Sequence, residues 1–585
     1  LRLPSGDAFT FRSQKPLAGV TEITVTNVDV NTVRVTVVGE NSQPTVELFD
    51  DDAGLVFGVG RSAIATVPPQ QTEAPQKPEP EKPTSQTKPE EPEAQQDEPI
   101  ELVVTGEQDG YRVPNTTTGT RTDTPLRDIP QSIQVVPRQV IEDQQITRVG
   151  DALQNVSGVQ RVNGSSRAQF DRFIIRGFDS SLDGVLRNGV RDRSNARIPS
   201  ETSNIERVEI LKGPASVLYS QGSLGGTVNV VTKQPLRDPF YAVEGVFGNY
   251  DFYRGAIDLS GPLNSDKTLL YRLNAAIESS GSFIDFLDRQ RYFISPVLSW
   301  QIGERTKLTL DAEYVETRQP DDLGLPAEGT VLNNPNGKIP LNRFLGEPES
   351  QNNWSAFRFG YDFEHRFSEN WQVRNTFRST LLGREQILIL PTALLADKRR
   401  VSRSYAEVED SYAFNTYTLD THVIGKFKTG SIQHQLVTGI DFSREDAFLN
   451  FFSRSIDPID VFNPVYGQRL GQFISRTNQV VTLDILGIYL QDQITLADNL
   501  KLLLGGRFDI ANRQVEDYLN RANTGNQQNE AFSPRVGIVY QPIPPLSLYA
   551  SYSRSFSQII GTGFDTEPFQ PERGTQYEVG IKADL

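Results

Sequence analysis

Long alternating segments dominate the second half of the chain. Within Thr306–Glu316, four apolar residues alternate with four polar or charged ones: Leu308, Leu310, Ala312 and Tyr314 against Lys307, Thr309, Asp311 and Glu313. The same period of two recurs in Tyr271–Glu278, Thr416–Phe427, Leu500–Ile510, Leu546–Tyr552 and Thr575–Leu585. Successive side chains of a strand point to opposite faces, so each segment has one apolar and one polar face. The segments mostly reach the roughly 9–11 residues that cross a bilayer, against about five or six in globular sheets.

Three features favour a membrane wall over a soluble sandwich. The apolar faces carry aromatic residues near strand ends, the opposite faces carry charges, and short turns alternate with long polar loops such as 318–352 and 444–480. We therefore expect a mainly β protein, with a transmembrane antiparallel β-barrel of about fourteen strands over residues 240–585.

The sequence stops in mid-strand, at Lys582-Ala583-Asp584-Leu585. A barrel with two open edges would leave on the order of ten polar groups unpaired at each edge, at several kcal/mol each in lipid. We therefore expect the barrel to be incomplete, truncated at its C-terminus.

Residues 111–235 have a different pattern, which predicts a compact α/β unit. Helices are expected from Pro137 and over Val149 to Asn155, and strands at Phe173–Arg176 and Ile205–Leu211. The glycine run 222–226 lacks the spacing and the Lys-Ser/Thr ending of a phosphate-binding loop, so it predicts tight backbone turns.

The N-terminal part consists of a small module and a spacer. Residues 1–66 predict β-structure, for example at Thr32–Val37 and Leu55–Phe57. Residues 67–99 hold nine prolines, eight acidic residues and three lysines. Such a segment cannot bury enough apolar surface to fold, and in extended form it spans roughly 100 Å.

A short β-prone run, Ile100–Gly106, follows the spacer directly. It can add a strand to the sheet edge of a partner, or it can be the first strand of the next domain. The local residues leave both interpretations open.

The amino-acid composition argues against several classes of protein. The chain of 585 residues has no Cys and a net charge of −16, which excludes disulfides and argues against a nucleic-acid partner. No apolar run is long enough for a helical membrane span. The three histidines lie far apart and no nucleophile constellation is present, so we expect neither an enzyme nor an intrinsic metal or cofactor. The chain begins at Leu1 without an export signal, which we expect to be removed or to lie outside this sequence.

Five motifs, in order along the chain, carry a resemblance to TonB-dependent ferric-siderophore receptors. They are Thr124–Ile133, Phe173–Phe178, Ile205–Tyr219, Gly225–Lys233 and Gly574–Gly580. The family closes a barrel of 22 strands around a plug, which implies a plug at 111–235 and an incomplete barrel here. Residues 1–66 also resemble the end of an AMIN domain, which implies a periplasmic module and peptidoglycan as a candidate partner. A β-rich adaptor that binds no ligand is the alternative interpretation of this module.

The resemblance implies roles for particular residues. The TonB box, which pairs with the energy-transducing TonB-type protein and its ExbB/ExbD-type motor, falls on Ile100, Glu101, Leu102, Val103, Val104, Thr105 and Gly106. A plug–barrel lock is expected from Arg176, Lys212 and Glu578, although Lys212 stands where the family has Arg. Outward plug loops offer siderophore-binding candidates at Arg167, Gln169, Phe170, Arg193 and Arg197.

The expected function is therefore energy-coupled import of ferric siderophores by a monomer in the outer membrane, surrounded by its lipid, with ferric iron only as part of the substrate. Cobalamin, another metal chelate or a glycan is the alternative substrate. A passive porin and a cell-wall anchoring protein are rival classes, and the plug with its candidate box argues against the porin. The sequence does not distinguish hydroxamate, catecholate and mixed siderophores.

Overall fold

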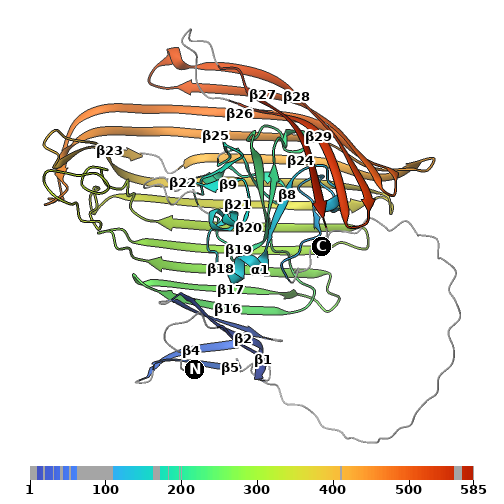
Figure 1. Cartoon of the computed structure of the whole chain (residues 1–585), viewed down its shortest axis with the longest axis horizontal. Coiled ribbons are helices and arrows are strands. Elements are labelled where there is room, and N and C mark those ends of the chain that lie inside the picture. Colours follow the sequence, from blue (N-terminus) through green and yellow to red (C-terminus); the bar gives the residue numbers. More distant parts are fainter. Residues whose placement is uncertain are drawn as a thin grey trace, which may run out of the picture.

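The structure is a computed structural model that describes five strands between residues 10 and 61, and residues 110–583 apart from 163–170, 182, 197, 199, 409–411 and 559–568. Most of these residues form one curved antiparallel sheet, the barrel wall, with the plug inside its curve (Figure 1). Among the described residues, no helix combines the length and the apolar composition required to cross a bilayer.

The barrel wall contains fifteen strands that pair in sequence order. They are β16 (Phe240–Gly248), β17 (Phe252–Pro262), β18 (Leu269–Ser280), β19 (Arg289–Gln301), β20 (Thr306–Arg318), β21 (Gln351–Arg366), β22 (Trp371–Leu394), β23 (Arg400–Val408), β24 (Tyr412–Thr429), β25 (Ile432–Asp460), β26 (Leu470–Ala497), β27 (Leu500–Asp517), β28 (Gly525–Ile543), β29 (Leu546–Ser557) and β30 (Glu572–Ala583). Both β23 and β24 pair with β22 and with β25, so they share one position end to end. Fifteen strands minus this shared one give fourteen positions, in agreement with the number expected from the alternating segments.

The two faces of the wall differ as the alternation predicts. Along β28, Phe532, Val536 and Ile538 are exposed on the outside, at 61%, 44% and 42% of their surface. Ser533 and Arg535, between them in the pleat, are buried against the plug side. The apolar side chains thus face lipid and the polar ones face the interior, which confirms the predicted fold class.

The connections at the two ends of the wall differ in length. At one end, 430–431, 498–499 and 544–545 are turns of two residues, whereas the opposite end carries 319–350 and 558–571. The first long loop was predicted. The prediction of a loop over 444–480 was wrong, because β25 and β26 continue through it to a turn at 461–469.

The N-terminal module forms strands β1 (Thr10–Leu17), β2 (Val20–Asp29), β3 (Thr32–Gly39), β4 (Pro44–Asp51) and β5 (Gly54–Arg61). β1, β2 and β3 pair antiparallel, and β4 and β5 form a hairpin. β3 also pairs with the edge of β16, with Val35 opposite Gly245.

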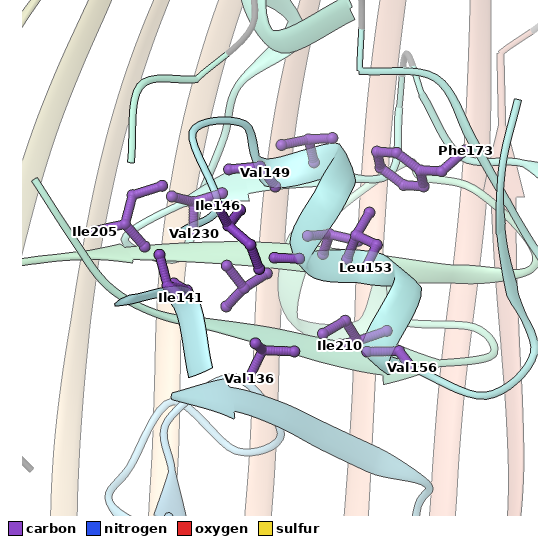
Figure 2. Packing of buried hydrophobic residues seen from close by; sticks show 14 of the residues in the cluster. Val136, Ile141, Ile146, Val149, Leu153, Val156, Phe173, Ile205, Ile210 and Val230 are labelled. Atoms are coloured by element: carbon purple, nitrogen blue, oxygen red, sulfur yellow. The ribbon is translucent and has the colours of Figure 1, made fainter. Parts of the chain in front are cut away.

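The plug is built on a five-stranded sheet in the order β13 (Val190–Arg191), β12 (Val185–Arg187), β15 (Gly226–Thr232), β14 (Ile205–Lys212) and β8 (Ile133–Pro137). Its helices α1 (Arg138–Asp143) and α2 (Val149–Ala152) pack on this sheet, and β15 runs parallel to β12. The core joins helix and sheet residues such as Ile141, Leu153 and Ile210 (Figure 2). The remaining plug elements are β6 (Asn115–Thr116), β7 (Thr124–Pro125), η1 (Leu126–Asp128), η2 (Leu153–Asn155), β9 (Val159–Arg161), β10 (Phe173–Ile175), β11 (Phe178–Asp179), η3 (Arg193–Ala196) and α3 (Ser216–Tyr219).

Candidate functional site: the plug–barrel interface

A tight hairpin between β10 and β11 presents the first plug–barrel contact. Arg176 and Gly177 form its two-residue turn, with φ of 50° and 89°. Two successive positive φ angles are typical of a type I′ turn, which favours Gly at the second position. The turn points the Arg176 guanidinium at β30, where it donates to the Gln576 side chain at 2.9 Å and the Glu578 carboxylate at 3.1 Å.

Glu578 collects several donors on the inward face of β30. Besides Arg176, it accepts hydrogen bonds from the Ser132 backbone N–H at 2.9 Å and the Tyr549 hydroxyl at 2.5 Å. Its side chain is only 9% exposed. Of the three lock candidates, the structure therefore brings Arg176 and Glu578 together.

The third candidate, Lys212, contacts the plug itself. It ends β14, and its ammonium donates to the Gln134 side chain and to the Ser157 hydroxyl, the latter at 3.0 Å. Partial burial lowers the pKa of Lys212, and the nearby Arg176 lowers it further. No direct ion pair joins Lys212 to the wall among the described residues. A second wall glutamate is expected beyond Leu585, so the role of Lys212 in the lock stays a prediction.

Arg193, one of the residues predicted to bind siderophore, lies in the plug–barrel interface. Its guanidinium pairs with Asp183 of the plug at 2.5 Å and with Glu445 of β25. Its side chain is 20% exposed, so it has little surface left for a ligand in this conformation. The other binding candidates, Arg167, Gln169, Phe170 and Arg197, lie outside the described residues, as does Ile100–Gly106.

Further contacts with charged residues surround the plug, and none of them was predicted from the sequence. Glu313 of β20 accepts from Arg187 at 3.0 Å and from Asn204 at 2.9 Å. Other plug–wall pairs are Arg121–Asp420, Glu201–Arg254, Lys233–Asp258, Asp128–Lys501 and Ser220–Asp509. The alternation along Thr306–Glu316 predicted that Glu313 faces inward. It did not indicate which plug residue Glu313 would contact.

Loop 319–350 covers the end of the wall that carries the long connections. Ile339 and Leu345 of this loop pack against Val401, Ile459 and Val461 at the far ends of β23 and β25. Buried Arg403 of β23 reinforces the contact by donating to the Gly346 carbonyl at 3.0 Å and pairing with Glu347 at 2.9 Å.

The histidines do not form a metal site in the described structure. His422 lies on the inward face of β24, as predicted, where its Nδ1 is 2.6 Å from Asp420. No group of three or more His, Cys, Asp or Glu side chains suited to a metal ion occurs in the part of the chain that the structure describes.

The arrangement is that of a stopper held inside a wall by non-covalent contacts. Ion pairs and hydrogen bonds distributed over β17, β20, β24, β25, β27 and β30 position the plug. Such contacts can be broken and re-formed in sequence, so the plug can move relative to the wall without covalent change.

Family models match most of the chain. The model of the TonB dependent receptor-like β-barrel matches residues 299–585, the TonB-dependent receptor plug domain matches 125–227, and the AMIN domain matches 1–59.

Curated relatives and solved structures agree with these models. The metal-pseudopaline receptor CntO of Pseudomonas aeruginosa is 36% identical over 81% of this chain and 68% of its own length. The ferrichrome outer membrane transporter/phage receptor of Escherichia coli is 30% identical over 80% of this chain and 66% of its own. The chain thus spans about two thirds of these relatives. The ferripyoverdine receptor of P. aeruginosa bound to ferripyoverdine has a similar fold, with a TM-score of 0.70 and 24% identity over 82% of this chain and 64% of that one.

Proposed function

Since the chain belongs to the TonB-dependent receptor family of the outer membrane, we propose that it imports ferric siderophores in an energy-coupled way. The observation that carries this proposal is the plug held within the wall by contacts such as Arg176–Glu578 and Arg193–Glu445. A porin needs no such stopper, whereas a receptor that captures a scarce ligand needs a closed path until energy is supplied. The protein acts without an intrinsic cofactor and not as an enzyme, and ferric iron enters only with its chelator.

The substrate class rests on the relatives. Proteins named as receptors for ferrichrome and ferrioxamine B match over about four fifths of this chain. The relative at 36% identity is named a metal-pseudopaline receptor, which makes another metal chelate the second candidate. Cobalamin and glycans are less favoured, because none of these relatives is named for either.

An uptake panel decides between the candidates. Cells that carry this receptor as their only one are given radioactive iron on hydroxamate, catecholate and mixed siderophores, and radioactive divalent metals with pseudopaline. We expect uptake of at least one iron complex above that of cells without the receptor. Uptake of the metal–pseudopaline complexes alone would overturn the siderophore proposal in favour of the second candidate.

Energy coupling depends on Ile100–Gly106, the predicted TonB box. The box lies between the proline-rich spacer and the start of the plug, where a partner's sheet edge can reach it. We propose that ligand binding exposes the box, and that the TonB-type protein with its ExbB/ExbD-type motor then remodels the plug.

Deleting Ile100–Gly106 tests this step. We expect transport to be abolished while ligand binding at the cell surface is retained, because the binding surface and the plug remain in place. Binding and uptake of the same radioactive complex are measured in parallel, and uptake equal to that of the intact receptor would contradict the proposal.

The remaining partners follow from the domain organisation. We propose that the wall is embedded in outer-membrane lipid as a monomer, and that the AMIN-like module and the spacer lie in the periplasm, with peptidoglycan as a candidate partner of the module.

A further inference from the structure

Two cavities lie between the plug and the same three wall strands, β24, β25 and β26. The larger, of about 1240 Å³, opens at the end of the wall with two-residue turns and is bordered by the plug segment 120–130. The smaller, of about 60 Å³, is bordered by plug residues around Arg191 and Arg193. We call them the lower chamber and the upper cavity.

The order of residues along each strand shows that the two spaces follow one another. On β24, Thr416 and Thr418 border the upper cavity, whereas Lys426 and Lys428 border the lower chamber. On β26, Leu483 and Ile485 border the upper cavity, and Gln493 and Thr495 the lower chamber. A layer of buried inward side chains therefore separates them, with Asp420, His422 and Ile424 on β24 and Tyr489 and Gln491 on β26.

Arg121 of the plug closes this layer. Its guanidinium donates to Asp420 at 2.8 Å, to the Tyr489 hydroxyl at 2.9 Å and to the Leu218 carbonyl at 2.5 Å. It also lies over the Tyr489 ring, 4.7 Å from the ring centroid, in a cation–π contact. His422, Ile424 and Val437 fill the wall side of the same layer, and all three are buried.

The segment that carries Arg121 is suited to withdrawal. Arg121 has a φ of 62°, a left-handed conformation that a non-glycine residue adopts only when its surroundings hold it there. The turn is closed by β6 and β7, which pair through two residues each. It also begins within ten residues of the start of the plug, so traction on the chain from the N-terminal side reaches it before the core of the plug.

The lining of the lower chamber suits passage of an oxygen-rich, anionic complex. Three lysines, Lys426, Lys428 and Lys501, border it against two carboxylates, Asp123 and Asp128, and Asp128 is paired with Lys501. Amide and hydroxyl side chains make up much of the remaining lining. A passage has to bind its cargo weakly enough to release it, and a mildly basic, hydrogen-bonding surface meets that need.

This inference rests on the proposed import of siderophores. We propose that the ferric complex leaves through the lower chamber, along β24–β27. Arg121, together with Asp420 and Tyr489, forms the gate above this chamber. The lower chamber is thus a transit site for anionic metal chelates on the periplasmic side of the plug. Withdrawal of the turn around Arg121 joins the two spaces.

Single cysteines test the route, because the natural chain has none. Gln435→Cys places a thiol in the lower chamber, on β25. Lys307→Cys is the matched control, since Lys307 lies on the inward face near the same end of β20 but does not border the chamber. Cells are treated with a fluorescein maleimide small enough to pass porins, labelling is measured on gels, and uptake of a radioactive ferric siderophore is followed.

We expect labelled Gln435→Cys to lose uptake while keeping surface binding, and labelled Lys307→Cys to keep both. Full uptake by labelled Gln435→Cys, or equal loss at both positions, would overturn the route. If the unlabelled receptor fails to import any ferric siderophore, the proposed function fails instead, so the two failures are distinguishable.

A second measurement tests the gate. Arg121→Ala removes the closing side chain, and Arg187→Ala removes a plug–wall contact to Glu313 in another sector. In planar bilayers we expect Arg121→Ala to raise the ion conductance of the purified protein well above that of Arg187→Ala. Equal conductance of the two variants would remove Arg121 from the gate.

Discussion

A single buried carboxylate can hold two domains together when several donors converge on it. Glu578 receives the Ser132 N–H, the Tyr549 hydroxyl and the Arg176 guanidinium. Hydrogen bonds to charged groups are stronger than neutral ones, and a buried donor left without its acceptor costs about 1–3 kcal/mol. Loss of this one side chain therefore affects plug and wall residues at once.

Glu578→Ala is expected to loosen the start of β8. Because each 1.4 kcal/mol is a factor of ten, hydrogen–deuterium exchange of the peptide containing Ser132 should become about ten- to a hundredfold faster. Glu578→Gln keeps an acceptor for Ser132 and Tyr549, so a smaller increase is expected. Asp179→Ala, which breaks the half-exposed pair with Arg172, serves as the control and should leave this peptide unchanged.

For single residues, the sequence predicted correctly which face of a strand a side chain occupies, because this depends only on the alternation along the strand. It placed Glu578 and His422 on inward faces, since the pleat fixes the direction of every second side chain. It did not predict that Arg193, a ligand-binding candidate, pairs with Glu445, 252 positions away. The residues around a plug charge do not indicate which charged residue of the barrel wall will pair with it.

The long hairpins at the loop end are held by polar contacts as well as apolar ones. The Arg403 side chain is completely buried and donates to the Asp457 carbonyl of β25 at 3.0 Å. The same guanidinium contacts Gly346 and Glu347, so it connects β25 to loop 319–350. Removing one partner of a buried ion pair leaves the other uncompensated, which costs about 3–5 kcal/mol.

Arg403→Ala is accordingly expected to free loop 319–350. Trypsin added to intact cells should cleave at Lys338 or Arg343 much faster than in the unaltered protein. Arg400→Ala is the control, because the pair of Arg400 with Asp397 is exposed and contributes at most about 1 kcal/mol. Equal cleavage of both variants would show that Arg403 does not hold the loop.

The wrong loop prediction over 444–480 has a physical cause at the scale of the element. Outside the bilayer both faces of a strand meet water, so the apolar–polar alternation is no longer required. In β25, Ser453, Arg454 and Ser455 follow one another although all three pair with neighbouring strands. The sequence of such a segment therefore predicts a polar loop. Its backbone hydrogen bonds to the neighbouring strands nevertheless make it a strand.

At the scale of the whole molecule, the wall and the plug were predictable because each follows from one repeated rule or one group of motifs. The position of the N-terminal module was not. The structure pairs β3 with the edge of β16, whereas we propose a periplasmic module. The pairing of β3 with β16 and a periplasmic position of the module exclude each other in the membrane. If the pairing were kept there, β1 would present an open sheet edge to lipid.

A double cysteine variant decides this point. Val35 and Gly245 are paired across β3 and β16, so Val35→Cys with Gly245→Cys would form a disulfide if the strands stay together. We expect no crosslink in outer membranes, as judged by gel mobility with and without reductant. Quantitative crosslinking would place the module beside the barrel.

The length of β26 also determines the height of the protein above the cell. Its 28 residues, at about 3.3 Å each and a tilt of about 45°, rise roughly 65 Å, of which about 30 Å lies in hydrocarbon. The remainder lies outside the hydrocarbon, and the turn at 461–469 stands at its far end. Antibodies and other large molecules that approach from that side would therefore meet this hairpin before they meet the part of the wall that lies in the bilayer.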